Sequence, residues 1–78
     1  MSYTRDAKFA PTPQQFRAAR AVKGWTVRKV CEQTAMGEGT LGKLEGDGDA
    51  RLSSADKLRE LYENEGFSFA PDGRGLSW

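Results

Sequence analysis

The sequence predicts a mainly α-helical chain: four short helices followed by a small C-terminal β-hairpin. Apolar residues recur at helical spacing through most of 12–66, and residues that start and stop helices punctuate this pattern. From residue 67 onward the pattern changes to alternation around turn-forming residues. The 78 residues are enough for one small domain. We therefore expect a flexible N-terminal arm over 1–11, a helical domain over 12–66 and the hairpin over 67–78.

The first helix is predicted to start at Thr12-Pro13. A threonine hydroxyl at the N-cap accepts from a free backbone N–H, and proline at the first helical position gives up no hydrogen bond. Phe16, Ala19 and Arg20 then share one face. Lys23-Gly24 is expected to end the helix, because glycine readily adopts the left-handed cap conformation.

The stretch from Gly24 to Gly46 organises the rest of the chain. Thr26 is a good N-cap for one short helix, and the small residues of 35–37 permit a tight corner before a second short helix, with Met36 filling the gap between the two. In both helices the inward positions are three or four residues apart: Val30, Thr34, Leu41 and Leu44. Two short helices joined by a tight corner form a helix-turn-helix layout.

The last helix follows a loop whose Asp and Gly residues, 47–51, only superficially resemble a calcium-binding loop. That run is too short and lacks the required glutamate, so we expect no calcium site there. Residues 53–56, Ser-Ser-Ala-Asp, predict the helix start, and 64–66 its end. Its inner face is expected to carry Leu58, Leu61 and Tyr62.

Residues 67–70 and 76–78 alternate apolar and polar side chains on either side of the turn-forming segment 71–75. Phe69, Leu76 and Trp78 cannot all be buried against so few helices, so we expect them to form an apolar patch that a second copy covers in a homodimer. The alternative is a hairpin folded back on its own last helix, which leaves the chain monomeric.

Composition narrows the function. The sequence has no His and a single Cys, which removes the commonest general base and leaves no zinc site, so we expect neither an enzyme nor a metal or other cofactor. Hydrophobic residues are 37% of the chain and charged residues 29%, which leaves no room for a membrane span. No apolar run near the N-terminus resembles a signal peptide, and a cytoplasmic location is therefore expected.

The net charge of +1 hides an uneven distribution. Residues 5–29 hold seven basic residues and one acidic residue, a balance of +6, whereas 30–51 hold two basic and five acidic residues, a balance of −3. A basic front half suits contact with phosphates, and Arg5 and Lys8 in the arm could join that contact. The acidic segment 30–51, however, contains the second helix of the helix-turn-helix, and an acidic helix does not favour contact with DNA.

Several short segments, in this order and spacing, resemble the phage-repressor/Cro-type (XRE-like) helix-turn-helix family. These segments are Arg17-Ala18-Ala19-Arg20, Gly24-Trp25-Thr26, Thr40-Leu41 and Leu44-Glu45-Gly46. The residues Leu58 to Tyr62, Gly66 to Phe69 and Asp72-Gly73 are similar to the C-terminal end of small bacterial members. The likeness extends over about 12–78. It implies a bacterial or phage transcriptional regulator, repressor-like, that binds double-stranded DNA in the major groove.

The resemblance also implies roles for single residues. The second helix of the motif would present its base-facing side chains to the major groove, while the first crosses the phosphates. An ion pair between Arg20 and Glu45 would join the first helix of the chain to the end of the base-reading helix. Trp25 would fill the core rather than stack on bases, and Cys31 would be a buried, inert thiol. The candidate DNA-binding set is Arg17, Val27, Arg28, Lys29, Glu38, Gly39, Thr40 and Lys43.

The sequence departs from the family at several of these positions. Val27 stands where a polar residue such as Gln is usual, and glycine stands at 37, 39 and 42 where polar or basic residues are usual. Glycine offers no side chain to read bases, although it permits a close backbone approach to DNA or ordering of the helix on binding. The alternative function is therefore a helix-turn-helix module that binds another regulatory protein, such as an antiactivator or antirepressor, and not DNA.

Overall fold

The computed structural model describes residues 10–46 and 51–78. Its described part contains four α-helices, α2 (Pro13–Lys23), α3 (Val27–Thr34), α4 (Glu38–Glu45) and α5 (Leu52–Asn64), followed by the strands β1 (Ser68–Phe69) and β2 (Leu76–Ser77). This architecture confirms the predicted fold class. The expected phosphate contact of Arg5 and Lys8 lies outside the described residues. So does most of the loop at 47–51 that was compared with a calcium-binding loop.

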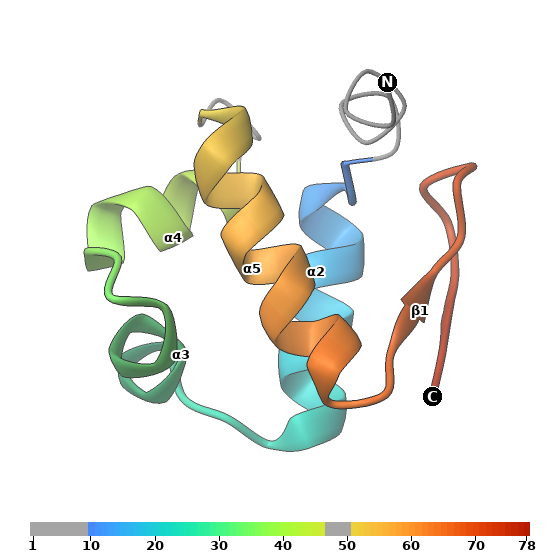
Figure 1. Cartoon of the computed structure of the whole chain (residues 1–78), viewed down its shortest axis with the longest axis horizontal. Helices are drawn as coiled ribbons and strands as arrows, with labels where there is room; N and C mark the ends of the chain where they lie inside the picture. Colours follow the sequence, from blue (N-terminus) through green and yellow to red (C-terminus); the bar gives the residue numbers. More distant parts are fainter. Residues whose placement is uncertain (1–9, 47–50) are drawn as a thin grey trace.

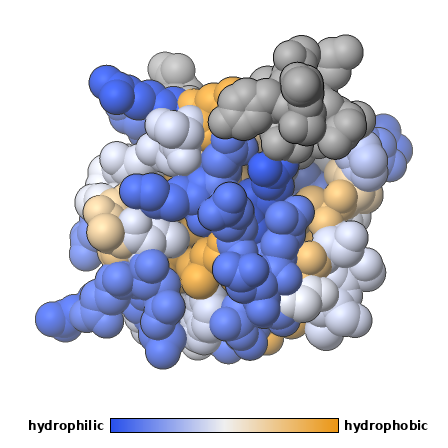
Figure 2. Space-filling view, viewed as in Figure 1, coloured by the Kyte–Doolittle hydropathy of each residue, from blue (hydrophilic) through white to orange (hydrophobic). Residues whose placement is uncertain are grey.

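The helices form a compact bundle with the hairpin on one side. Figure 1 shows α2 and α5 at the centre, α3 and α4 on one side of them, and the hairpin on the other. β1 and β2 pair antiparallel, with Ser68 opposite Ser77 and Phe69 opposite Leu76. The face shown in Figure 2 is mostly hydrophilic over α5, with hydrophobic residues showing in small separate areas, one of them beside the hairpin. None of the helices described here is both long and apolar enough to cross a bilayer.

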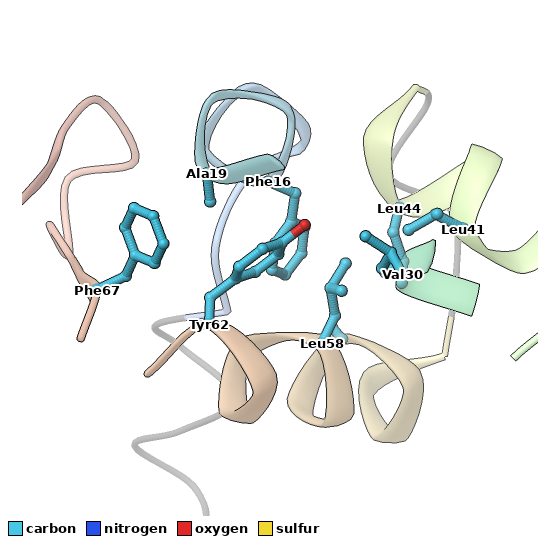
Figure 3. Packing of buried hydrophobic residues seen from close by; sticks show 9 residues of the cluster. Phe16, Ala19, Val30, Leu41, Leu44, Leu58, Tyr62 and Phe67 are labelled. Atoms are coloured by element: carbon cyan, nitrogen blue, oxygen red, sulfur yellow. The ribbon is translucent and has the colours of Figure 1, made fainter. Parts of the chain in front are cut away.

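One apolar core joins all four helices to the segment before β1 (Figure 3). Tyr62 lies at its centre, fully buried, with its ring near those of Phe16, Phe67 and Phe69 at centroid distances of 5.7–6.4 Å. Side chains from every helix complete the core: Ala19, Val30, Leu41, Leu44, Ala55 and Leu58. The predicted inward positions of the helices therefore pack against one another, with Leu61 only half-buried.

The predicted helix ends are confirmed for α2 and α3. Thr12 caps α2 in a reciprocal capping box with Gln15, and Gly24 ends that helix in the left-handed conformation. Thr26 caps α3 by accepting from the backbone N–H of Lys29 at 3.1 Å. Each cap satisfies a donor that the helix itself leaves free, which is why these boundaries could be identified in the sequence.

The predicted start of the last helix is wrong by a few residues. α5 begins at Leu52, after Arg51 at the N-cap, and no side chain caps it. Ser53 and Ser54 therefore lie within the first turn and do not precede it. Serine at a helix start is a preference worth about 1 kcal/mol, which packing of the helix on its neighbours outweighs.

The hairpin is attached to the start of α2 by side chains. The Gln15 amide donates to the carbonyls of Ala70 and Gly75 at 2.9 and 2.7 Å, and the Thr12 hydroxyl donates to the carbonyl of Gly73 at 3.0 Å. Gly73 has a φ of +81°, and a Cβ there would lie 2.8 Å from the Thr12 methyl group. Glycine is thus required at this turn both by its backbone conformation and by the close approach of α2.

Candidate nucleic-acid interface

The corner between α3 and α4 is tight because Ala35 adopts the left-handed conformation, with φ of 60°. A residue with a Cβ pays about 1–2 kcal/mol for this conformation, and a small side chain limits the clash. Met36 next to it is half-buried and packs against the core, as predicted. The corner therefore fixes the orientation of α4 relative to α3.

α4 is held to the protein along one face and free along the other. Leu41, Leu44 and Glu45 are buried, whereas Glu38, Gly39, Gly42 and Lys43 are exposed and Thr40 is half-buried. A Cβ added at Gly39 or Gly42 would meet nothing within 4 Å. The outward face of α4 therefore offers a short length of bare backbone between the side chains of Glu38 and Lys43.

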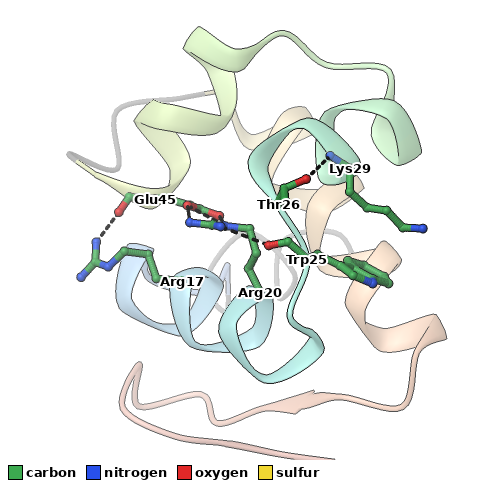
Figure 4. A network of polar contacts seen from close by, with 6 residues as sticks. All are labelled: Arg17, Arg20, Trp25, Thr26, Lys29 and Glu45. Carbon is green, nitrogen blue, oxygen red and sulfur yellow. Dashed lines mark hydrogen bonds and ion pairs between the residues drawn. The ribbon is translucent and has the colours of Figure 1, made fainter.

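Arg20 and Glu45 form the expected ion pair between α2 and the end of α4. The Arg20 guanidinium donates from Nε and Nη2 to both carboxylate oxygens at 2.9–3.2 Å, and its Nη1 donates to the carbonyl of Trp25 at 3.2 Å (Figure 4). The hydrogen bonds that Arg20 donates to the Glu45 carboxylate raise the pKa of Arg20. The charge of Glu45 is thus neutralised inside the protein.

Arg17, a member of the candidate DNA-binding set, also reaches the end of α4. Its side chain is exposed, yet Nη1 donates to the backbone carbonyl of Glu45. That carbonyl is one of the orphan acceptors at the C-terminus of α4, where a cation also complements the helix dipole. Arg17 therefore contributes to positioning α4, in addition to any role toward a ligand.

The start of α3 presents cations on its outer side. Arg28 and Lys29 are both exposed, while Val27 is half-buried and packs against the core. Arg28 forms a loose ion pair with Glu32, 3.7 Å away and one helical turn further on. Exposed pairs of this kind contribute only a fraction of a kcal/mol, so Arg28 remains available to a stronger anion.

Trp25 lies between the core and these cations. One face of its ring stacks on Tyr62, with centroids 6.0 Å apart and planes at 24°, which supports the expectation that it fills the core. The ring is only half-buried, however, and the ammonium groups of Lys23 and Lys29 lie 5.2 and 5.8 Å from its centroid. Lys23 is half-buried and also pairs with Glu65 at 2.9 Å.

Other candidates from the sequence fall outside this region. Cys31 is half-buried, less than expected, and its pKa is raised by desolvation, which keeps the thiol protonated and unreactive near neutral pH. No group of His, Cys, Asp or Glu in the described part of the chain could hold a metal ion. Phe69 and Leu76 are half-buried and pack against the core of their own chain, whereas Trp78 is 74% exposed.

Comparison of the chain with protein-family models, with curated proteins and with solved structures found no match.

Proposed function

We propose that this protein is a sequence-specific DNA-binding transcriptional regulator, repressor-like, of the phage-repressor/Cro-type helix-turn-helix kind, acting in the cytoplasm of a bacterium or on behalf of a mobile element. The observation that carries the proposal is the arrangement of α4, which is pinned to the protein by its inner face and by two arginines of α2, and presents its other face outward. A recognition helix needs this combination of rigid support and free surface.

The charges around α4 favour DNA more than the sequence balance indicates. Of the acidic residues in 30–51, Glu45 is neutralised by Arg20. Glu38 lies in the first turn of α4, where a carboxylate is favoured by the helix dipole. Arg28, Lys29 and Lys43 remain exposed as cations on the outer side of α3 and α4.

In the proposed complex, α4 enters the major groove with its N-terminal residues toward the base edges, and the start of α3 crosses the phosphates. Lys43 donates to guanine O6 or N7, Glu38 accepts from cytosine N4, and Thr40 and Gly39 complete the base-facing set. Arg28 and Lys29 contact phosphates. Val27 is largely occupied in the core and contributes a backbone contact at most.

A band-shift titration with the promoter of the protein's own operon tests the proposal, repeated across salt concentrations. We expect a shift that weakens steeply as salt rises, because each phosphate contact releases condensed counterions. The alternative function, a module that binds another regulatory protein, is favoured by the bare glycine face of α4. It predicts no shift at any salt concentration.

Two substitutions separate base reading from phosphate contact. Lys43→Ala removes a base-edge donor, so it should relax sequence preference, whereas Arg28→Ala should weaken binding to all sequences alike. Competition assays with the promoter and an unrelated duplex measure both effects. If both variants keep wild-type affinity and preference, the proposed orientation of α3 and α4 on DNA is wrong.

We further propose that the protein acts as a homodimer joined through the hairpin. Phe69 and Leu76 are partly used inside their own chain, so Trp78, largely exposed at the end of the hairpin, is the main contact. The register places Trp78 opposite Phe67, and their rings lie 5.9 Å apart. A second copy would cover this indole and the unpaired strand edges together.

A further inference from the structure

We propose that Lys23, Trp25 and Lys29 form a phosphate-binding cluster at the junction of α2 and α3, and that Glu65 competes with the phosphate for Lys23. This inference rests on the proposed function and names a contact on the DNA backbone beside the base-reading helix. The junction cluster, as we call these three residues, combines a fixed aromatic ring with two converging ammonium groups.

The ring of Trp25 is held in place from two directions. Its inner face stacks on Tyr62, which is fully buried, and its backbone carbonyl accepts from Arg20, which is itself fixed by Glu45. Trp25 also immediately precedes Thr26, the N-cap of α3, so its backbone is set by the start of that helix. The ring is therefore a rigid platform that does not depend on a ligand for its position.

Two ammonium groups converge on this platform although they repel each other. Lys23 lies 5.2 Å and Lys29 5.8 Å from the ring centroid, and the buried face of the ring is occupied by Tyr62. Figure 4 shows the Lys29 side chain extended from α3 toward the indole. Attraction between a cation and the ring is worth about 0.5–1 kcal/mol at an exposed site, so it orients the two lysines without neutralising them.

The charge at the cluster is only half compensated. Glu65 pairs with Lys23 at 2.9 Å, and both side chains are partly exposed to solvent. The ammonium group of Lys29 lies near the ring of Trp25 and pairs with no carboxylate among the described residues. A phosphate placed between the two lysines would therefore satisfy Lys29 and displace Glu65 from Lys23.

A phosphodiester of DNA fits this cluster better than an isolated small anion. The cluster lies at the N-terminal end of α3, the helix that crosses the phosphates in the proposed complex, and beside exposed Arg28. The flat outer part of the indole offers an apolar surface for a deoxyribose next to the phosphate. Contacts of this kind set the position of the protein on the duplex without reading its sequence.

The test is a salt titration of binding to a duplex of random sequence. Lys29→Gln and Lys23→Gln should each weaken binding, and the double variant, which loses the shared phosphate, should make the slope of log affinity against log salt shallower by about 0.9. Lys57→Gln, an exposed lysine on α5, is the matched control and should change neither quantity. Lys29→Arg keeps the charge and should retain the wild-type slope.

Glu65→Gln provides a test in the opposite direction. Removing the carboxylate that competes for Lys23 should raise affinity for every duplex, and adding Lys23→Gln should abolish that gain. The emission of the wild-type chain minus that of a Trp25→Phe chain gives the contribution of Trp25, which should change when the duplex binds.

The outcomes separate this inference from the proposed function. If the wild-type chain binds its promoter while Lys23→Gln, Lys29→Gln and Glu65→Gln behave as wild type, or if Trp25 emission is unchanged at saturating duplex, the junction cluster is wrong and the proposed function stands. If the wild-type chain binds no duplex at any salt concentration, both are overturned.

Discussion

Glu45 is the residue on which the position of α4 depends. Its carboxylate accepts hydrogen bonds from Arg20, and its backbone carbonyl accepts one from Arg17. Two neighbouring turns of α2 therefore bind the last residue of α4. The pair is largely shielded: the side chain of Glu45 is 9% exposed and that of Arg20 26%. Losing Arg20 would leave a buried carboxylate without its partner, whereas losing Arg17 would leave a neutral carbonyl.

We therefore expect Arg20→Ala to destabilise the fold by about 3 kcal/mol, at the low end of the range for broken buried pairs because Arg20 is partly exposed. Arg17→Ala should cost about 1 kcal/mol, as expected for one hydrogen bond. Thermal melts of the two variants measure the difference. Equal losses of stability, or a larger loss for Arg17→Ala, would contradict the conclusion that the Arg20–Glu45 ion pair is the stronger of the two contacts.

Tyr62 carries a hydroxyl that the core does not use. The group is buried and has no hydrogen-bond partner among the residues that the structure describes, and burial, followed by the charge of Glu45, raises its pKa above the ordinary value of about 10. A raised pKa in the fold means that the unfolded chain loses this proton first as the pH increases. The contribution of Tyr62 to stability is therefore complete below about pH 10 and is lost above it.

Tyr62→Phe should accordingly be almost neutral at pH 7, because it removes an unsatisfied polar atom without changing the packing of the ring. Above about pH 10 the melting temperature of the wild type should fall more steeply with pH than that of the variant. Melts at a series of pH values provide the comparison. Parallel curves would show that the hydroxyl does not ionise on unfolding.

At the scale of elements, α4 is the least stable helix by composition and depends most on its neighbours. It has eight residues, glycine at the N-cap, and Gly39 and Gly42 within it, and no side chain caps its start. Each interior glycine costs about 0.5–1 kcal/mol relative to alanine. The packing of Leu41 and Leu44, together with the hydrogen bonds from the two arginines of α2, offsets this loss of helix stability.

Gly39→Ala and Gly42→Ala should each stabilise the fold by about 0.5–1 kcal/mol, since neither added methyl group meets another atom. They should differ in DNA binding. Gly39 belongs to the proposed base-facing set, so a methyl group there should weaken promoter binding, whereas Gly42→Ala should bind as wild type. Denaturant melts and band shifts on the same samples report the two effects. A loss of stability in either variant would show that the outward face of α4 has no room for the added methyl group.

The elements also show what the sequence could and could not reveal. The caps at Thr12, Thr26 and Gly24 were predictable because each depends on residues a few positions away. The bonds from Gln15 to the hairpin and from Arg17 to α4 were not, because a side chain bonding to a distant backbone carbonyl leaves no periodic pattern. The Arg20–Glu45 pair was anticipated only through the resemblance to a family of regulators.

Part of the candidate interface could also be predicted from the sequence, and part could not. Helical spacing separates the buried Leu41 and Leu44 from the exposed Lys43, so the outward face of α4 follows from the sequence. The convergence of Lys23 and Lys29 on Trp25 does not, because it depends on the crossing of two helices and on the stacking of Trp25 against α5. The family resemblance implied a core position for Trp25 and a DNA contact for Lys29, and nothing in the sequence connected either residue with Lys23.

At the scale of the whole molecule, the exposed Trp78 sets the expectation for assembly. Trp78→Ala should convert a dimer to a monomer in sedimentation equilibrium and weaken promoter binding, because two joined copies hold a duplex more tightly than one. Leu52→Ala removes another exposed apolar side chain, on α5, and should leave the dimer intact. A wild-type chain that remains monomeric at high concentration without DNA would refute the proposed dimer.

The attachment of the hairpin to α2 has a consequence for the order of folding. The three side-chain bonds that hold it join residues 55–61 positions apart, so a long loop of chain must close for them to form. The caps that start α2 and α3, by contrast, join residues only three positions apart. We expect the backbone amides of Ala70 and Gly73 to exchange with deuterium before those of α2, which would mark the hairpin as the last part to fold and the first to open.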